Sequence, residues 1–118
     1  MPRFPLFTDN HIRQQLVDGL VRRAWDVQRA IDVFPEGTLD SVLFPYAAEH
    51  GRVLVTNDNR MRVTGEEWLA EGKPFIGLII WELEHHRHLS EGWFIEKFEE
   101  LAEMDEPFFY PIRHLNRN

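Results

Sequence analysis

Three aspartates stand at points in the sequence where a sheet edge would bring them together. Asp9 follows the short apolar segment at residues 5–8, Asp40 lies in the first turn of an expected helix, and Asp58 ends the run Gly-Arg-Val-Leu-Val-Thr-Asn-Asp. Clustered carboxylate oxygens are the ligands that Mg²⁺ or Mn²⁺ prefers. Such an ion can activate water and neutralise charge on a phosphodiester. The sequence therefore predicts a site for Mg²⁺ or Mn²⁺ formed by Asp9, Asp40 and Asp58.

Each aspartate taken alone also has a purely structural interpretation. Asp9 and its neighbour Asn10 are good helix caps. Asp40 could complement the dipole of the helix that it begins, which is worth about 0.3–1 kcal/mol. Asp58 could form a turn before Asn59. The expectation that all three meet at one sheet edge favours a functional site over three separate structural roles.

The elements that would position these residues are indicated by apolar runs and helical stripes. Residues 52–56 contain almost nothing polar between Arg52 and Thr56, which is typical of a strand buried on both faces of a parallel sheet. The carboxyl edge of such a sheet is where ligands bind. We expect strands at 5–8, 25–29, 52–56, 75–83 and 108–112, the last at an edge. We expect helices from 12 to about 23, from a Thr38 cap to Gly51, over 66–71, and from a Ser90 cap to about 104.

This alternation of strands and helices predicts the class of fold. It indicates an α/β protein: a three-layer α/β/α sandwich with a mainly parallel sheet and residues 52–56 in its interior. A length of 118 residues suits one domain, 1–118, with a core of its own. The chain has no cysteine, which excludes disulfides and thiolate metal sites. Without a membrane-length apolar run or a signal-type N-terminus, we expect a cytoplasmic protein with no membrane partner.

The charge distribution bears on nucleic-acid binding. The net charge is −7, whereas nucleic-acid binders usually present a basic face. Arginines concentrate in residues 1–62, and Arg13, Arg60 and Arg62 lie near the expected site as candidate phosphate contacts. Residues 82–106 are strongly acidic, and we expect them to avoid nucleic acid. The tract of His85, His86 and His88 within that region could bind metal, but no matched ligand set accompanies it, so a solvated loop is the preferred interpretation.

The sequence resembles a known family over a large part of its length. The resemblance rests on Leu6-Phe7-Thr8-Asp9, Leu16-Val17 with Leu20, Asp26-Val27, Leu39-Asp40, and the continuous segment from Ala47 to Asp58. On these residues the chain resembles the PIN-like domains of the DUF5615 family, relatives of the PIN-domain toxin ribonucleases and of the Mut7-C type. The likeness covers residues 4–60 and extends more loosely over 68–83. It implies a PIN-like fold and a Mg²⁺- or Mn²⁺-dependent endoribonuclease of a type II toxin–antitoxin system.

The resemblance also implies roles for individual residues and partners. Asp9, Asp40 and Asp58 take the catalytic, metal-binding positions. Thr56 and Asn57 flank the site. Together with Asn10, Arg13 and Arg60, which lie near the expected sheet edge, they are the candidate substrate-binding residues. The implied partners are an RNA substrate and a cognate antitoxin protein, with a homodimer also possible.

The chain departs from the family pattern at three places. Asn10 replaces the usual Glu after the first Asp, His11 replaces the usual Asn, and Asn59-Arg60 replaces a second acidic residue. Fewer acids weaken metal affinity, so a catalytically impaired PIN-like module acting through protein–protein binding is the alternative. A phosphoacceptor receiver domain is set aside, because it expects a lysine after a late strand and Lys73 precedes one.

Overall fold

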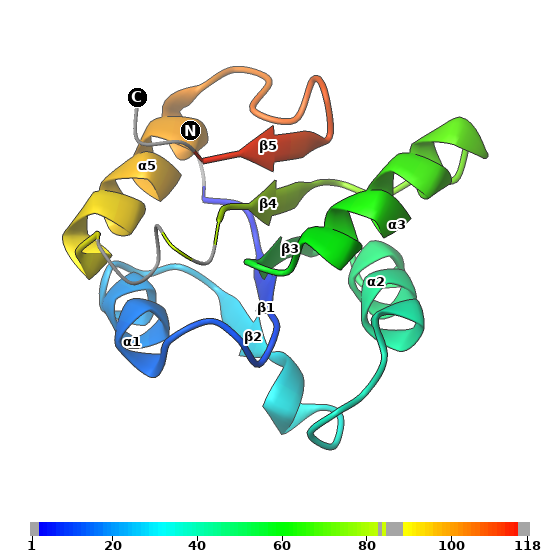
Figure 1. The fold of residues 1–118 in the computed structure, drawn as a ribbon. Coiled ribbons are helices and arrows are strands. Elements are labelled where there is room, and N and C mark those ends of the chain that lie inside the picture. The colour runs from blue at the N-terminus through cyan, green and yellow to red at the C-terminus, as the bar shows by residue number, and fades with distance from the viewer. Residues whose placement is uncertain (1–2, 83, 85–88, 116–118) are drawn as a thin grey trace.

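The protein is built on a twisted sheet whose described strands all run parallel (Figure 1). The computed structural model describes residues 3–82, 84 and 89–115. Within those residues the sheet has five strands in the order β2-β1-β3-β4-β5. The strands are β1 (Leu6–Thr8), β2 (Val27–Arg29), β3 (Val53–Thr56), β4 (Leu78–Ile80) and β5 (Ile112–His114). The predicted α/β fold is confirmed, and β3 lies between β1 and β4 as expected.

Helices cover both faces of this sheet. The helices are α1 (Gln14–Arg22), a 3₁₀ turn (Ala30–Asp32), α2 (Asp40–Glu49), α3 (Asn59–Ala70) and α5 (Glu91–Glu103). Helices α1 and α5 pack together on one face, and α2 and α3 pack together on the other (Figure 1). Adjacent β1 residues face opposite layers, since Leu6 belongs to one apolar cluster and Phe7 to the other. Burial on both faces explains why the strands read as continuous apolar runs.

The direction in which successive strands are added to the sheet reverses between β1 and β3. The chain passes from β1 outward to β2 at one edge, and then returns to place β3 on the opposite side of β1. The carboxyl ends of β1 and β3 therefore flank the position where ligands bind in open α/β sheets. Asp9 follows β1 directly, and Asp58 follows β3 after one intervening residue.

Two predicted helix caps are wrong. Helix α1 begins at Gln14, its N-cap is Arg13, and no side chain caps it. Asp9 instead accepts a hydrogen bond from the backbone N–H of His11, in the turn before the helix. Helix α2 is preceded by Leu39, while the Thr38 hydroxyl donates to the carbonyl of Pro35 in the turn before it. In both cases the polar side chain stabilises a turn upstream of the helix.

The helix predicted over 66–71 is present, but its predicted start is wrong. Helix α3 starts at Asn59, because Asp58 is its N-cap and accepts from the backbone N–H of Arg60. The buried residues of α3 are Met61 and Gly65, one turn apart. Two such residues are too few to show a helical period in the sequence. The last helix begins at the expected Ser90 cap.

The outer strands are shorter or shifted from their predicted bounds. Strand β4 spans three residues of the expected 75–83, and β5 begins at Ile112, after Pro111. Strand β5 lies at the sheet edge as predicted. His85, His86 and His88 lie outside the described residues. None of the helices in the described part of the chain is long and apolar enough to cross a membrane.

Candidate functional site

A cleft of about 430 Å³ opens at the carboxyl edge of the sheet. It lies where β1 and β3 end and where α2 begins. Its lining consists of Asp9, Asn10, His11, Glu36, Gly37, Thr38, Leu39, Asp40, Leu43, Asp58 and Arg60. The structure therefore brings together Asp9, Asp40 and Asp58, which the sequence places far apart. Asn10 and Arg60, predicted as substrate-binding residues, line the same cleft.

Asp9 is the most tightly held of the three carboxylates. The residue is 5% exposed, and one carboxylate oxygen accepts from the His11 N–H at 2.9 Å. The other oxygen accepts from the Thr56 hydroxyl, and the Thr56 oxygen in turn accepts from the Asp58 N–H at 3.0 Å. Burial raises the pKa of Asp9, although the hydrogen bonds from Thr56 and His11 act in the opposite direction. Thr56 thus links the first carboxylate to the backbone of the third.

Asp40 lies at the first residue of α2, where its carboxylate faces the cleft lined by the other two. Burial is the main cause that raises the pKa of Asp40, and the negative charge of Asp58 raises it further. Because the repulsion from Asp58 is felt at Asp40, the two groups share one electrostatic environment.

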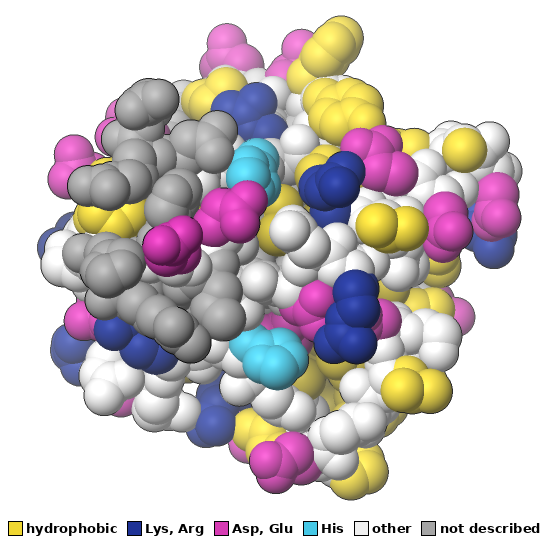
Figure 2. All heavy atoms as spheres, in the orientation of Figure 1, with side chains coloured by type: hydrophobic (Ala, Val, Ile, Leu, Met, Phe, Trp, Pro, Cys, Tyr) yellow, Lys and Arg dark blue, Asp and Glu magenta, His cyan; other side chains and the backbone are white. Residues whose placement is uncertain are grey.

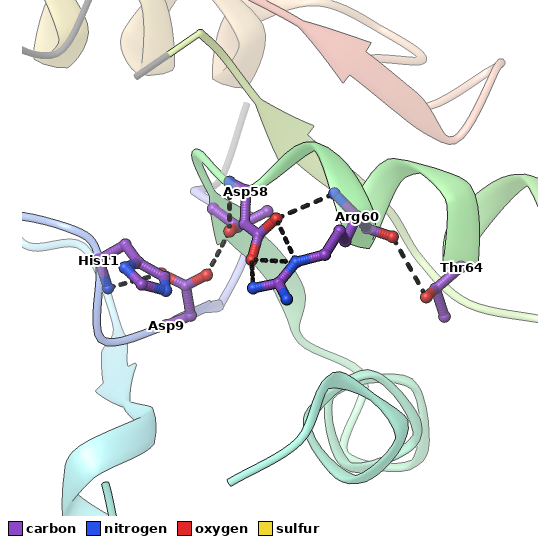
Figure 3. Close-up of polar contacts among 6 residues, drawn as sticks. Asp9, His11, Asp58, Arg60 and Thr64 are labelled. Carbon is purple, nitrogen blue, oxygen red and sulfur yellow. Dashed lines mark hydrogen bonds and ion pairs between the residues drawn. The ribbon is translucent and has the colours of Figure 1, made fainter. Parts of the chain in front are cut away.

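Asp58 is bound to a cation of the chain itself. The Arg60 Nε atom lies 3.1 and 3.2 Å from its two oxygens, and Nη2 lies 2.7 Å from Oδ2. Figure 3 shows the Arg60 side chain folded back onto this carboxylate. The hydrogen bonds from Arg60 hold the pKa of Asp58 below its ordinary value. Asp58 therefore caps α3, a role that the expected turn before Asn59 did not include, and also lines the cleft.

The other predicted substrate-binding residues do not line the cleft. Thr56 and Asn57 are buried behind it, and the Asn57 side-chain amide donates to the carbonyl of His11 at 3.3 Å. Arg13 points to the N-terminal end of α5, where it pairs with Glu91 at 2.7 Å and donates to the carbonyl of Leu89. Thr56 and Asn57 thus support the lining, and Arg13 joins two helices.

His11 was not selected by the sequence prediction, although it lines the cleft (Figure 3). His11 also lowers the pKa of Asp9, Asp40 and Asp58, but less than burial changes the first two and less than the Arg60 hydrogen bonds change the third. His11 is therefore within electrostatic range of all three. Its place two residues after Asp9 was the available signal.

The donor chemistry of this cleft fits a divalent cation, since hard carboxylate oxygens from three elements face one space. Across the described ranges, however, no group of three His, Cys, Asp or Glu side chains is placed to hold one ion. Both oxygens of Asp58 are also engaged by Arg60. Ligation by all three carboxylates therefore requires side-chain movement, beginning with the release of Asp58 by Arg60.

The surface around the edge of the sheet carries charges of both signs. Figure 2 shows Lys or Arg side chains lying directly against Asp or Glu side chains, with hydrophobic side chains scattered between them. Among the described residues, this face presents no continuous basic patch of the kind that dominates many nucleic-acid interfaces.

The comparison with known families supports the PIN-like fold. A family model described as "PIN like domain" matches residues 4–76, which run from β1 through α3 and include all three aspartates. The chain belongs to the PIN-like domain family. PIN-like domains form part of a nuclease-like superfamily, and the match covers more than half of this chain. No curated protein and no solved structure matches it.

Proposed function

We propose that this PIN-like domain is a cytoplasmic, metal-dependent endoribonuclease, the toxin of a type II toxin–antitoxin pair, of the DUF5615 branch. The observation that carries the proposal is the convergence of Asp9, Asp40 and Asp58 in one cleft at the reversal point of the sheet. That position is the ligand site of open α/β folds. Membership of the PIN-like family supplies the connection to nuclease chemistry.

Asp9, Asp40 and Asp58 would hold the ion, Mg²⁺ or Mn²⁺. When bound, such an ion activates water and stabilises negative charge on a phosphodiester. The remaining work is done by the chain. The Thr56 hydroxyl and the His11 N–H fix the orientation of the Asp9 carboxylate. Asn57 anchors the loop after β1 to the end of β3, which holds the two strand ends in register.

Substrate binding is assigned to the polar groups at the mouth of the cleft. Asn10 and Arg60 line it and can contact RNA, Asn10 through its amide and Arg60 through its guanidinium. The arginine is the stronger candidate for phosphate, because a guanidinium can donate two parallel hydrogen bonds to phosphate oxygens. Arg13 would require release from Glu91 to take part.

The test is cleavage of an end-labelled single-stranded RNA by the purified protein with Mn²⁺, with Mg²⁺ or with chelator. We expect cleavage that needs the metal and that falls at least about a hundred-fold in Asp58→Asn, in the range seen when a group that stabilises the transition state is removed. Arg62, which the sequence analysis considered as a phosphate contact, is an exposed residue of α3 outside the cleft lining. Arg62→Gln is therefore the matched control and should cleave like the parent. Undiminished cleavage in chelator would contradict the metal requirement.

The second candidate is a PIN-like module without catalysis that acts through protein–protein binding. The specific observation in its favour is that Arg60 occupies both oxygens of Asp58. Two exposed apolar side chains suit a protein partner: Leu39, which lines the cleft and is 70% exposed, and Val42 of α2, which is 43% exposed. Under this candidate, RNA stays intact under every metal condition, while a partner still binds beside the cleft.

A further inference from the structure

Arg60 makes contacts with Asp58 that helix α3 does not require. The helix is already capped, because Asp58 Oδ1 accepts from the backbone N–H of Arg60 at 2.9 Å. The guanidinium adds further hydrogen bonds to both carboxylate oxygens, the shortest at 2.7 Å. The same two oxygens are the ones that a metal would need.

The exposure of the two partners is very unequal. The side chain of Arg60 is 81% exposed, and that of Asp58 is 16% exposed. An ion pair with one partner in water adds little to folding. Arg60 can therefore leave Asp58 without disturbing the core, provided that another cation takes over the charge of the carboxylate.

The guanidinium also acts on a second carboxylate of the cleft. Asp40 lines the same cleft as Asp58 and Arg60, so the guanidinium lies among the carboxylates of one lining. Arg60 thus lowers the repulsion between Asp40 and Asp58. Among the described residues that line the cleft, no other is an arginine or a lysine. A divalent ion in the same cleft would have the same electrostatic role.

We propose that Arg60 and a divalent metal ion compete for the Asp58 carboxylate, so that metal binding releases the Arg60 side chain from the site. This inference rests on the proposed function, because it needs a metal that binds at the three aspartates. Two cations close together on one carboxylate repel each other, so occupancy by one disfavours the other. The released guanidinium remains attached to the first turn of α3 at the cleft, where it can contact an RNA phosphate.

The first test is calorimetric titration of MnCl₂ into the parent, Arg60→Gln, Arg60→Lys and Arg62→Gln. Removal of the competing charge should tighten Mn²⁺ binding by roughly ten-fold in Arg60→Gln. Arg60→Lys keeps the charge but loses the planar guanidinium that contacts both Asp58 oxygens. Its affinity for Mn²⁺ should therefore lie between those of the parent and Arg60→Gln. Arg62→Gln should bind like the parent. Melting curves without metal establish that each variant is folded.

The second test follows the guanidinium directly by NMR. The Arg60 Nε–H signal is assigned by its loss in Arg60→Gln, and the parent is then titrated with diamagnetic Mg²⁺. The signal should move toward that of a solvated arginine with the same midpoint as Mg²⁺ binding. An unmoved signal at saturating Mg²⁺ would overturn the proposal.

The possible outcomes separate this inference from the proposed function. Equal Mn²⁺ affinity in the parent and Arg60→Gln would overturn the competition and leave a metal-dependent nuclease standing. A lack of Mn²⁺ binding in both proteins would overturn the competition and the metal-dependent function together. Tighter binding in Arg60→Gln, with an unchanged Arg62→Gln, supports the competition.

Discussion

At the scale of single residues, the site is defined by three like carboxylates in three different surroundings. Asp9 is buried and bonded to Thr56, Asp40 is partly buried beside a like charge, and Asp58 is paired with Arg60. The pKa values of Asp9 and Asp40 are consequently raised and that of Asp58 is lowered. Titratable groups whose surroundings push their pKa values apart are a frequent mark of functional sites.

Asp40→Asn should alter the pH dependence of stability in a defined direction. The pKa of Asp40 in the folded protein lies above its ordinary value of 3.8, so the folded state binds this proton more tightly than the unfolded chain. Ionisation of Asp40 therefore has no effect on the free energy of unfolding at pH values below 3.8. It lowers that free energy as pH rises from 3.8 through the raised pKa of the folded state, and the loss stays constant at higher pH. The variant should equal or slightly exceed the parent near neutral pH, even after losing a helix-dipole interaction of about 0.3–1 kcal/mol.

Urea unfolding of the parent and Asp40→Asn across the acid range measures this effect. Asp58→Asn provides the opposite sign, because the lowered pKa of Asp58 contributes stability above 3.8 that is lost as pH falls. A loss of stability in Asp40→Asn that appears only near neutral pH would contradict the assignment.

At the scale of elements, the sequence predicted the strand that is buried on both faces of the sheet and the start of the last helix. The apolar run before Thr56 could be recognised as an interior strand, because a strand covered on both faces has no polar alternation. The Ser90 cap of α5 was also visible, as serine is a strong capping residue. The starts of α1, α2 and α3 were not predictable in the same way. Asp9 and Thr38 stabilise turns before α1 and α2, and α3 buries only Met61 and Gly65.

The positions of the three aspartates were predictable because parallel connections return every strand end to the same edge. Their surroundings were not predictable. The hydrogen bonds from Arg60 to Asp58 form because the Arg60 side chain folds back within one helical turn. The spacing of residues in the sequence does not predict that conformation. The Thr56 bridge depends on the register between β1 and β3, which pairs Thr8 with Val55.

Gly77→Ala tests the packing between β4 and the segment before β5. A Cβ at Gly77 would overlap the ring of Phe108, with two more ring atoms at 2.7 and 2.8 Å. Overpacking of this kind costs roughly 1–3 kcal/mol in the free energy of unfolding. Gly92→Ala is the control, because its Cβ meets nothing closer than 3.7 Å and alanine favours the helix. Equal stability of Gly77→Ala and the parent in urea would show that Phe108 moves away freely.

At the scale of the whole molecule, net charge and site charge both oppose the approach of RNA. The chain carries a net charge of −7, and three of the residues lining its cleft are the converging aspartates. Phosphate enters such a cleft favourably only when cations neutralise it. A bound divalent ion and a released Arg60 would together supply that positive charge.

The proposed toxin role predicts a phenotype for the complete protein. Its expression should arrest growth of the host cell, and Asp58→Asn should abolish the arrest. Co-expression of the protein encoded by a neighbouring reading frame should restore growth if that protein is the antitoxin. Replacing Leu39 and Val42 by glutamate should weaken the rescue, because both apolar side chains are exposed and Leu39 lines the cleft. Arrest by Asp58→Asn equal to that by the parent would contradict the role of the cleft.

The central claim is that Asp9, Asp40 and Asp58 form one metal site, and thermal melting against Mn²⁺ concentration tests it most directly. The melting temperature of the parent should rise with the logarithm of Mn²⁺ concentration once the ion exceeds its Kd. Asp9→Asn, Asp40→Asn and Asp58→Asn should each flatten that rise, because each removes a ligand oxygen charge, while Arg62→Gln should follow the parent. A melting temperature of the parent that does not change with Mn²⁺ would contradict the claim.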